Sequence, residues 1–380
     1  MTWMGKAQQI RRQNMKVNVV ASKLYSMLRE DGLRCCILKG QGNALMYSNA
    51  YSRNPGDIDV WVNASREQIT EYAKTHFEIG NDIRFQHLET SMDGVPVELH
   101  FFPCTMNNPI YHVRLQKWFK RNADLQCSNV VSLPDGIGEI AIPTTAFNVI
   151  YQLTHLYHHF FDEGIGMRQI IDYFLVVNDF SKNVFLDTDF SNHPVPLSKE
   201  GSTSHPDPLT LRGEGGNRPT RCSEPLRSKD GGPSKVSPDC AGWDRLSIEG
   251  DNSAGSTTVV TSYASTALDV AQRELKYLGL WKFAGAVMYV LKEVLGLSED
   301  KMIVPVDEKR GRLLLAEILD GGNFGRHFSK YGGFTHQSMG KKYFLKIWRN
   351  MHFVRYYPAE ALCEPLFRTW HFFWRLKYKK

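Results

Sequence analysis

Two aspartates at the start of a short apolar run constrain the fold more than any other part of the chain. Asp57 and Asp59 stand one residue apart in Asp-Ile-Asp-Val-Trp-Val, residues 57–62. Side chains alternate between the two faces of a strand, so both carboxylates point to the same face. The apolar residues around them are typical of a strand buried in a sheet. We therefore expect a sheet that presents paired carboxylates, an arrangement that suits divalent metal ions.

A third acid lies further along the chain. In residues 95–100 the sequence alternates so that Glu98 and His100 share one face and apolar residues occupy the other. Two carboxylates at positions i and i+2 of a strand can bridge two metal ions about 3.5 to 4 Å apart, and an acid from a neighbouring strand completes the cage. Asp57, Asp59 and Glu98 fit this requirement. The alternatives are that the aspartates cap backbone N–H groups in a turn and that Glu98 is an ordinary solvated residue.

Short elements of alternating type surround these acids and predict an α+β domain over residues 1–142. Periodicity and glycine turns predict, in chain order, a helix at 7–31, a strand at 35–38, a short helix at 42–47, a strand at 57–62, a helix at 65–76, and strands at 83–88 and 96–102.

The second half of the chain is predicted to be mainly helical and to be interrupted. Helical spacing over residues 143–180 resumes at 264, with a break at Gly279 and further helices at 311–319 and 344–374. Eight of the seventeen prolines lie between residues 194 and 238, among glycine, serine and charged residues. Such a segment offers too little apolar surface to offset the entropy of ordering. We therefore expect a helical domain, residues 143–180 and 264–380, split by a disordered insertion at 181–263.

Composition favours a cytoplasmic protein without a disulfide framework. The seven cysteines are odd in number and never spaced as Cys-x-x-Cys, which argues against disulfides and a zinc site. Residues 1–13 lack the apolar core of a secretory signal, and no window approaches the roughly 20 apolar residues of a membrane helix. We therefore expect no transmembrane segment.

The net charge of +6 is concentrated near the C-terminus. Residues 341–380 carry ten Lys or Arg against two Glu, interleaved with aromatic residues. A basic, aromatic face suits RNA or an anionic membrane surface, whereas aromatic residues at helical spacing are more often core. Core packing is the default interpretation, and an RNA-associated protein ranks last among our functional hypotheses.

Three motifs, in this order, resemble the polymerase-beta-type nucleotidyltransferase superfamily, and in particular its branch of uncharacterised bacterial nucleotidyltransferases. They are Leu38-Lys39-Gly40, Asn54-Pro55-Gly56-Asp57-Ile58-Asp59 and Val97-Glu98-Leu99-His100. The resemblance implies a mixed sheet flanked by helices, followed here by a mainly helical C-terminal region. It also implies that Asp57, Asp59 and Glu98 are the catalytic residues and the ligands of a two-metal Mg²⁺ site.

The activity implied by the resemblance is transfer of a nucleoside monophosphate from an NTP such as ATP to a hydroxyl acceptor, with release of pyrophosphate. The acceptor would be a small molecule, a protein or an RNA. Lys39, Gly40 and Gln41 would bind the phosphates, with a salt bridge as the alternative for Lys39, and Arg53 would add charge or hold the loop. Gln41 stands where the superfamily usually has Gly or Ser, so we keep a second hypothesis, a non-catalytic nucleotide-binding or interaction module of the same fold.

Three histidines follow in the helical region. His155, His158 and His159 share one helix face, because residues three and four apart are neighbours on a helix. No third ligand of fitting position completes a metal site with them, so structural support is the default and contact with the nucleotide the alternative. Arg168 and Asp172, four residues apart, are expected to form an intrahelical ion pair.

Overall fold

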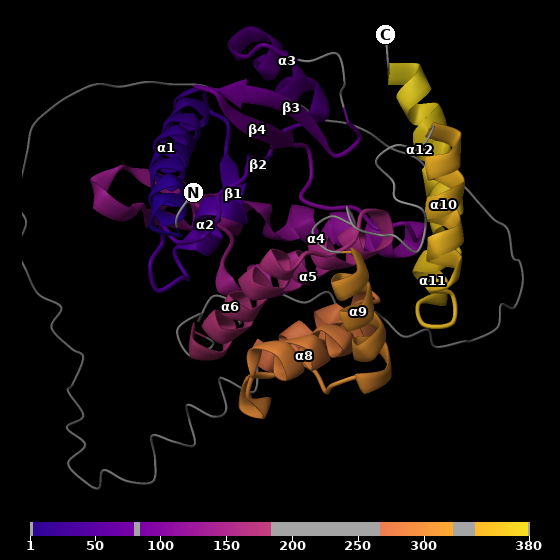
Figure 1. Ribbon diagram of the computed structural model, residues 1–380. Coiled ribbons are helices and arrows are strands. Elements are labelled where there is room, and N and C mark those ends of the chain that lie inside the picture. The colour runs from indigo at the N-terminus through magenta and orange to yellow at the C-terminus, as the bar shows by residue number, and fades with distance from the viewer. Residues whose placement is uncertain (1–2, 80–83, 184–266, 322–338, 379–380) are drawn as a thin grey trace, which may run out of the picture.

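The computed structural model describes residues 3–79, 84–183, 267–321 and 339–378 (Figure 1). Residues 267–277 are helical. The other elements, in chain order, are α1 (Trp3–Glu30), β1 (Cys35–Leu38), α2 (Gly40–Ala44), β2 (Ile58–Val62), α3 (Arg66–His76), β3 (His87–Met92), β4 (Val95–His100), α4 (Pro109–Ser128), β5 (Val130–Ser132), β6 (Glu139–Ala141), α5 (Thr145–Asp162), α6 (Met167–Asn183), α8 (Trp281–Leu295), α9 (Glu308–Gly321), α10 (Met339–Met351), α11 (Pro358–Ala361) and α12 (Glu364–Tyr378).

A four-stranded mixed sheet, in the order β1-β2-β4-β3, carries the predicted acids. Strand β2 is antiparallel to β1 and parallel to β4, and β3 is antiparallel to β4. The parallel pair needs a crossover connection, which α3 and β3 supply. The register places Asp59 opposite Glu98 and His87 opposite His100. The expected α+β class, with helices around a small mixed sheet, is confirmed.

The two faces of the sheet pack against different helices. On one face Ile37, Val60 and Leu99 lie in a core with the apolar stripes of α1 and α3. On the other face Trp61 stacks on Phe147 of α5, with ring centroids 6.0 Å apart. Burying each large side chain contributes roughly 1.5 to 3 kcal/mol, so both layers hold the sheet. The acids lie on the face covered by α4 and α5, because Asp59 alternates with Val60 and shares its face with Trp61.

The helices begin at residues whose side chains satisfy free backbone N–H groups. Ser65 and Gln68 form a capping box at α3, and Thr144 caps α5. Asn108 caps α4, where Pro109 occupies the first turn, a position that tolerates its missing N–H. The Thr144 cap fixes the residue at which α5 begins, and α5 is the helix that faces the acids.

The C-terminal helices continue the core that begins on the sheet. Phe160 of α5 packs against Phe353, with ring centroids 4.4 Å apart, in the same cluster as the apolar residues of α8 and α9. A Cβ at Gly311 of α9 would lie 2.3 Å from Tyr289 of α8, so this glycine permits close packing of the two helices. Helices α10, α11 and α12 form a column beside the sheet and α4 (Figure 1).

Ion pairs join this column to the rest of the molecule and use several of the basic residues of the tail. Arg349, 2% exposed, donates to Glu317 of α9 at 3.1 Å. Lys346 and Arg368 both contact Asp162 at the end of α5, at 3.0 and 3.1 Å. The default interpretation of the tail, helices packed on the core, therefore holds for these residues, and RNA or membrane contact stays a prediction.

Several predicted elements differ from the structure. The third strand is β3, His87–Met92, rather than residues 83–88, and helix α4 and the β5–β6 hairpin were not predicted. The helix break at Gly279 is confirmed by a φ of +73°. Residues 181–183 belong to α6, and the remainder of the expected insertion lies outside the described residues. The domain boundaries stay predictions.

Two compositional predictions bear on the described residues. Cys35, Cys36, Cys104, Cys127 and Cys363 are free thiols. No described helix is both long enough and apolar enough to span a bilayer. The cytoplasmic location stays a prediction.

Candidate active site

A cleft of about 280 Å³ lies between the acid-bearing face of the sheet and helices α5 and α6. Its walls bring together three groups of residues that are far apart in the sequence. They are the turn and strand residues Lys39, Gly40, Asp57, Asp59, Glu98 and His100, the β3 segment Arg84, Gln86 and His87, and the helical residues Gln152, His155, His158, His159, Arg168 and Asp172.

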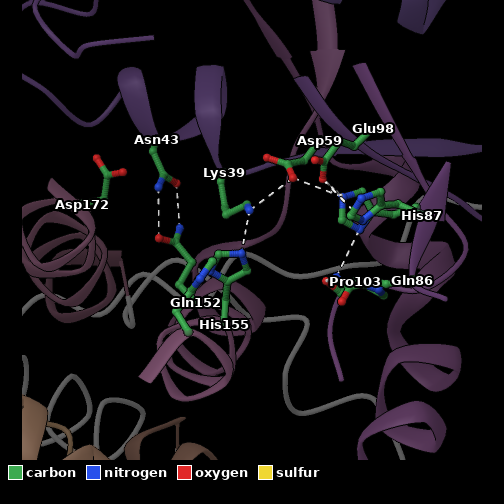
Figure 2. A network of polar contacts seen from close by, with 12 residues as sticks. Lys39, Asn43, Asp59, Gln86, His87, Glu98, Pro103, Gln152, His155 and Asp172 are labelled. Carbon is green, nitrogen blue, oxygen red and sulfur yellow. Dashed lines mark hydrogen bonds and ion pairs between the residues drawn. The ribbon is translucent and has the colours of Figure 1, made fainter. Parts of the chain in front are cut away.

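Asp59 is the most deeply placed of the three predicted acids. It is 6% exposed, and its Oδ1 lies 3.2 Å from Lys39 Nζ and 3.1 Å from His100 Nε2 (Figure 2). Burial opposes its negative charge, but the positive charges of Lys39 and His100 outweigh that effect and hold the pKa of Asp59 well below its usual range. Asp59 is therefore ionised and surrounded by cationic partners.

Glu98 and Asp57 line the same cleft as Asp59. Glu98, in register with Asp59 on the neighbouring strand, accepts a hydrogen bond from His100 Nε2 at 3.2 Å. Although burial opposes its charge, this hydrogen bond lowers the pKa of Glu98. Asp57 immediately precedes β2 and is exposed at the mouth of the cleft. Desolvation by the cleft walls raises its pKa, and the charges of Asp59 and Glu98 add to the rise. The structure thus brings the three acids together.

His100 neutralises part of this acid cluster. Burial disfavours its charged form, yet hydrogen bonds to Asp59 and Glu98 raise the pKa of His100 to about 9. Gln86 Nε2 lies 3.3 Å from His100 Nδ1, so Nε2 is the ring nitrogen that faces the carboxylates. The cluster therefore holds its negative charges with a buried imidazolium beside them.

Lys39 points into the cleft from a strained turn. Its φ of +50° is unusual for a residue with a side chain, and Gly40 follows at +40°. Backbone in such a region costs about 1 to 3 kcal/mol and is common where function imposes a conformation. Besides Asp59, its ammonium donates to His155 Nε2 at 2.8 Å. The structure thus shows a salt bridge for Lys39, and its contact with phosphate stays a prediction.

Gln41 does not face the cleft. Its side chain is 3% exposed and donates a hydrogen bond to Asn18 of α1. A neighbouring amide pair, in which Asn43 and Gln152 each donate to the other at 3.0 and 2.7 Å, holds α2 against α5 (Figure 2). Any contact of Gln41 with phosphate would therefore involve its backbone, and the prediction that Gln41 binds phosphate stays a prediction.

Arg53 holds the loop that leads to the acids. Its guanidinium makes three hydrogen bonds to the Asp172 carboxylate: Nε donates to Oδ1 at 3.0 Å and to Oδ2 at 3.2 Å, and Nη2 donates to Oδ2 at 2.8 Å. The predicted ion pair of Arg168 with Asp172 is wrong, because Arg53 and the Tyr47 hydroxyl occupy that carboxylate. Arg168 instead donates to the Asn54 carbonyl at 3.3 Å, and its buried Nε has no hydrogen-bond partner.

The α5 histidines line the wall opposite the acids. Burial, together with the nearby charge of Lys39, keeps the pKa of His155 well below its usual value, so His155 is neutral and accepts the lysine hydrogen bond. His158 Nδ1 lies 3.2 Å from Thr105 Oγ1. Burial also lowers the pKa of His159 to about 3. The default of structural support fits these contacts, and their place in the cleft keeps nucleotide contact open.

His87 was not foreseen from the sequence. It reaches the cleft because β3 pairs with β4 and places His87 beside His100, with ring centroids 5.0 Å apart. Burial and the charge of His100 lower the pKa of His87 to about 4. The signal that could have located it is the turn Asp93-Gly94, which sets the register of the hairpin.

Comparisons with known proteins show the family to which the chain belongs. A search of curated proteins returned no match. A solved antigenic nucleotidyltransferase-like protein from Paracoccidioides brasiliensis is 16% identical, with 46% of this chain and 85% of that chain covered at a TM-score of 0.28. The sequence model of a family described as uncharacterised nucleotidyltransferase matches residues 1–190, which is half of the chain and contains all three acids. The chain belongs to this nucleotidyltransferase family.

Proposed function

We propose that the protein is a magnesium-dependent nucleotidyltransferase that moves a nucleoside monophosphate from an NTP to a hydroxyl acceptor and releases pyrophosphate. The observation that carries the proposal is the register of the sheet, which sets Asp59 directly opposite Glu98 with Asp57 at the mouth of the same cleft. Membership of the nucleotidyltransferase family supports it.

The chemistry of the three acids fits divalent cations. Asp59 is buried, ionised and already in contact with the ammonium of Lys39, so this position accepts positive charge. Carboxylate oxygens are the ligands that Mg²⁺ prefers. Asp57, Asp59 and Glu98 would hold the ions, which when bound neutralise phosphate charge and activate the acceptor hydroxyl.

Basic side chains of the cleft are placed to orient the triphosphate. The Lys39 ammonium can leave Asp59 and contact a phosphate oxygen instead, because it has three N–H donors at the end of a flexible side chain. The Nε of Arg168 is a buried donor without a partner at the cleft wall, and a phosphate oxygen would satisfy it. Glu98, kept ionised by His100, accepts a hydrogen bond from the acceptor hydroxyl and aligns it for attack on the α-phosphorus.

A second pocket, of about 170 Å³, adjoins the first and provides room for an acceptor. The two pockets share residues of the β3 segment and of α5, including His87 and His158. Its opposite wall is α12, where Phe367 and His371 present aromatic rings. We therefore place the acceptor between the acids and α12, and its class, a small molecule, a protein or an RNA, comes from assay.

The test is turnover of nucleotides. Purified protein is incubated with each NTP, ATP first, and Mg²⁺, and pyrophosphate release and labelling from α-³²P-NTP are followed with an acceptor panel. Asp57→Asn and Asp59→Asn should each abolish the signal. Asp93→Asn is the matched control, since Asp93 is exposed on the β3–β4 turn and asparagine tolerates its φ of +51°.

Two outcomes contradict the proposal. If Asp59→Asn still releases pyrophosphate, the reaction takes place at a site that does not use Asp59. Nucleotide binding without turnover across the whole panel would favour the alternative, a non-catalytic nucleotide-binding module of the same fold.

A further inference from the structure

Three side chains beside the predicted acid site converge on one point. His87, Glu98 and His100 each offer a ligand atom, and these atoms all lie within 4.8 Å of one another. His87 and His100 face each other across the β3–β4 hairpin, and Glu98 stands two residues before His100 on the same face. Strands rather than loops therefore place all three groups.

The distances suit a small tetrahedral ion. Glu98 Oε2 lies 3.5 Å from His87 Nδ1 and 3.2 Å from His100 Nε2. Ligand bonds of about 2.0 to 2.1 Å in a tetrahedral zinc site separate neighbouring ligand atoms by about 3.3 Å. The two distances from Glu98 are already close to that value, and the two histidine nitrogens lie within 4.8 Å of each other.

His87 lacks the partners that a purely structural histidine would have. Its side chain is 12% exposed, and neither ring nitrogen makes a hydrogen bond. A buried polar group without a partner costs about 1 to 3 kcal/mol, and such groups call for an explanation. The carboxylate of Glu89 lies 3.7 Å from His87 Nε2, and the same oxygen forms an ion pair with Arg84 Nη2 at 2.6 Å. A metal ion would satisfy the ring nitrogen that faces Glu98.

Contacts of the Gln86 side chain hold the His100 ring with Nε2 toward Glu98. The Gln86 side chain contacts Nδ1 of His100 at 3.3 Å and donates to the Pro103 carbonyl at 2.8 Å (Figure 2). This contact fixes the orientation of the His100 ring. Nε2 is the nitrogen that faces Glu98.

We propose that His87, Glu98 and His100 bind a divalent transition-metal ion of the zinc type, which displaces the proton that His100 Nε2 shares with Glu98 and Asp59. Imidazole nitrogen suits Zn²⁺ and Co²⁺, whereas Mg²⁺ takes oxygen ligands. Glu98 is shared with the proposed nucleotidyl-transfer site, but binding at the histidines requires neither nucleotide nor turnover.

The experiment measures the metal alone. The full chain is stripped with chelator, dialysed and titrated with Co²⁺ without nucleotide, with its visible absorption and calorimetry as readouts, and then with Zn²⁺ and Mg²⁺ as competitors. We expect one equivalent of Co²⁺, displaced by Zn²⁺ and not by equimolar Mg²⁺. His87→Ala and His100→Ala should each weaken binding by at least the roughly 10- to 100-fold that loss of an outer-shell partner costs.

Control variants keep the result interpretable. His76→Ala, an exposed histidine on α3, should leave Co²⁺ binding unchanged. Asp57→Asn should retain Co²⁺ binding while losing turnover, so failure of the site and failure of the proposed function are distinguishable. If His100→Ala does not fold, His87→Ala carries the test. Co²⁺ binding that is equal in His87→Ala and wild type, or that Mg²⁺ displaces at equal concentration, overturns the proposal.

Discussion

The buried ion pair between Arg53 and Asp172 should dominate the stability of the loop that leads to the acids. The two side chains are each 7% exposed and lie 119 positions apart in the sequence. Asp172→Ala leaves the guanidinium buried and uncompensated, and it removes the acceptor of the Tyr47 hydroxyl, 2.7 Å away. Arginine cannot shed its proton to escape this cost.

The expected magnitude follows from these contacts. Removing one partner of a buried ion pair costs about 3 to 5 kcal/mol, and the lost tyrosine hydrogen bond adds about 1 kcal/mol. We therefore expect Asp172→Ala to lower the free energy of unfolding by about 4 to 6 kcal/mol. Arg53→Met should cost less, because the stranded carboxyl can take up a proton. In that variant the folded state retains a proton that the unfolded state has lost, so its stability should fall as pH rises from 5 to 8.

Urea unfolding at pH 5 and pH 8, followed by circular dichroism and tryptophan fluorescence, measures these differences. The exposed pair of Lys23 and Asp93, 2.9 Å apart, is the matched control, since Asp93→Asn should change stability by no more than about 1 kcal/mol. The reasoning is refuted if Asp172→Ala costs no more than this control, or if Arg53→Met shows no added loss at pH 8.

Two further predictions concern other buried charges. Burial raises the pKa of Glu360 to about 7, although the backbone N–H groups of Asn107 and Asn108 donate hydrogen bonds to its carboxylate. In the unfolded chain its pKa is about 4.3, so the folded state holds a proton that the unfolded state loses between about pH 4.3 and 7. The contribution of Glu360 to the free energy of unfolding should therefore decline by up to about 3 kcal/mol as pH rises through this range. Urea titrations across this range should show a flatter profile for Glu360→Gln, and an unchanged slope would contradict the assignment. Lys39→Met removes the cation beside Asp59, so the variant should have a lower melting temperature than wild type in chelator. Added Mg²⁺ should then raise the melting temperature of the variant by more than that of wild type. Equal increases in a thermal-shift assay would argue against a cation position at Asp59.

The arrangement of the acids could be predicted because strand alternation is a local rule. Apolar residues at every second position identified β2 and β4, and the period of two put Asp59 and Glu98 on defined faces. The family resemblance implied that the three acids share a site, but the register of the two neighbouring strands is a tertiary fact that only the structure shows.

The other features of the fold and the site were missed for two reasons. Some had a local sequence signal that was overlooked, and others depend on long-range contacts that no local pattern contains. Asp93-Gly94, with φ of +51° and +70°, joins β3 to β4 as a two-residue hairpin turn, and counting back from it would have paired His87 with His100. Asn108-Pro109 is a strong helix start that predicts α4. Asp172 was assigned to its helical neighbour because i, i+4 spacing is visible in sequence, whereas its partner from a distant loop is not.

Helix α12 carries a consequence for how this architecture could diversify. It lies in the half of the chain beyond the family match, yet it supplies one wall of the pocket that adjoins the acids. Arg368 of α12 contacts Asp162 at the end of α5, whereas Asp59 and Glu98 lie on β2 and β4. The acids and the aromatic wall of the adjoining pocket thus belong to separate stretches of sequence. A relative with a different C-terminal segment could keep the same acids and bind a different molecule in the adjoining pocket.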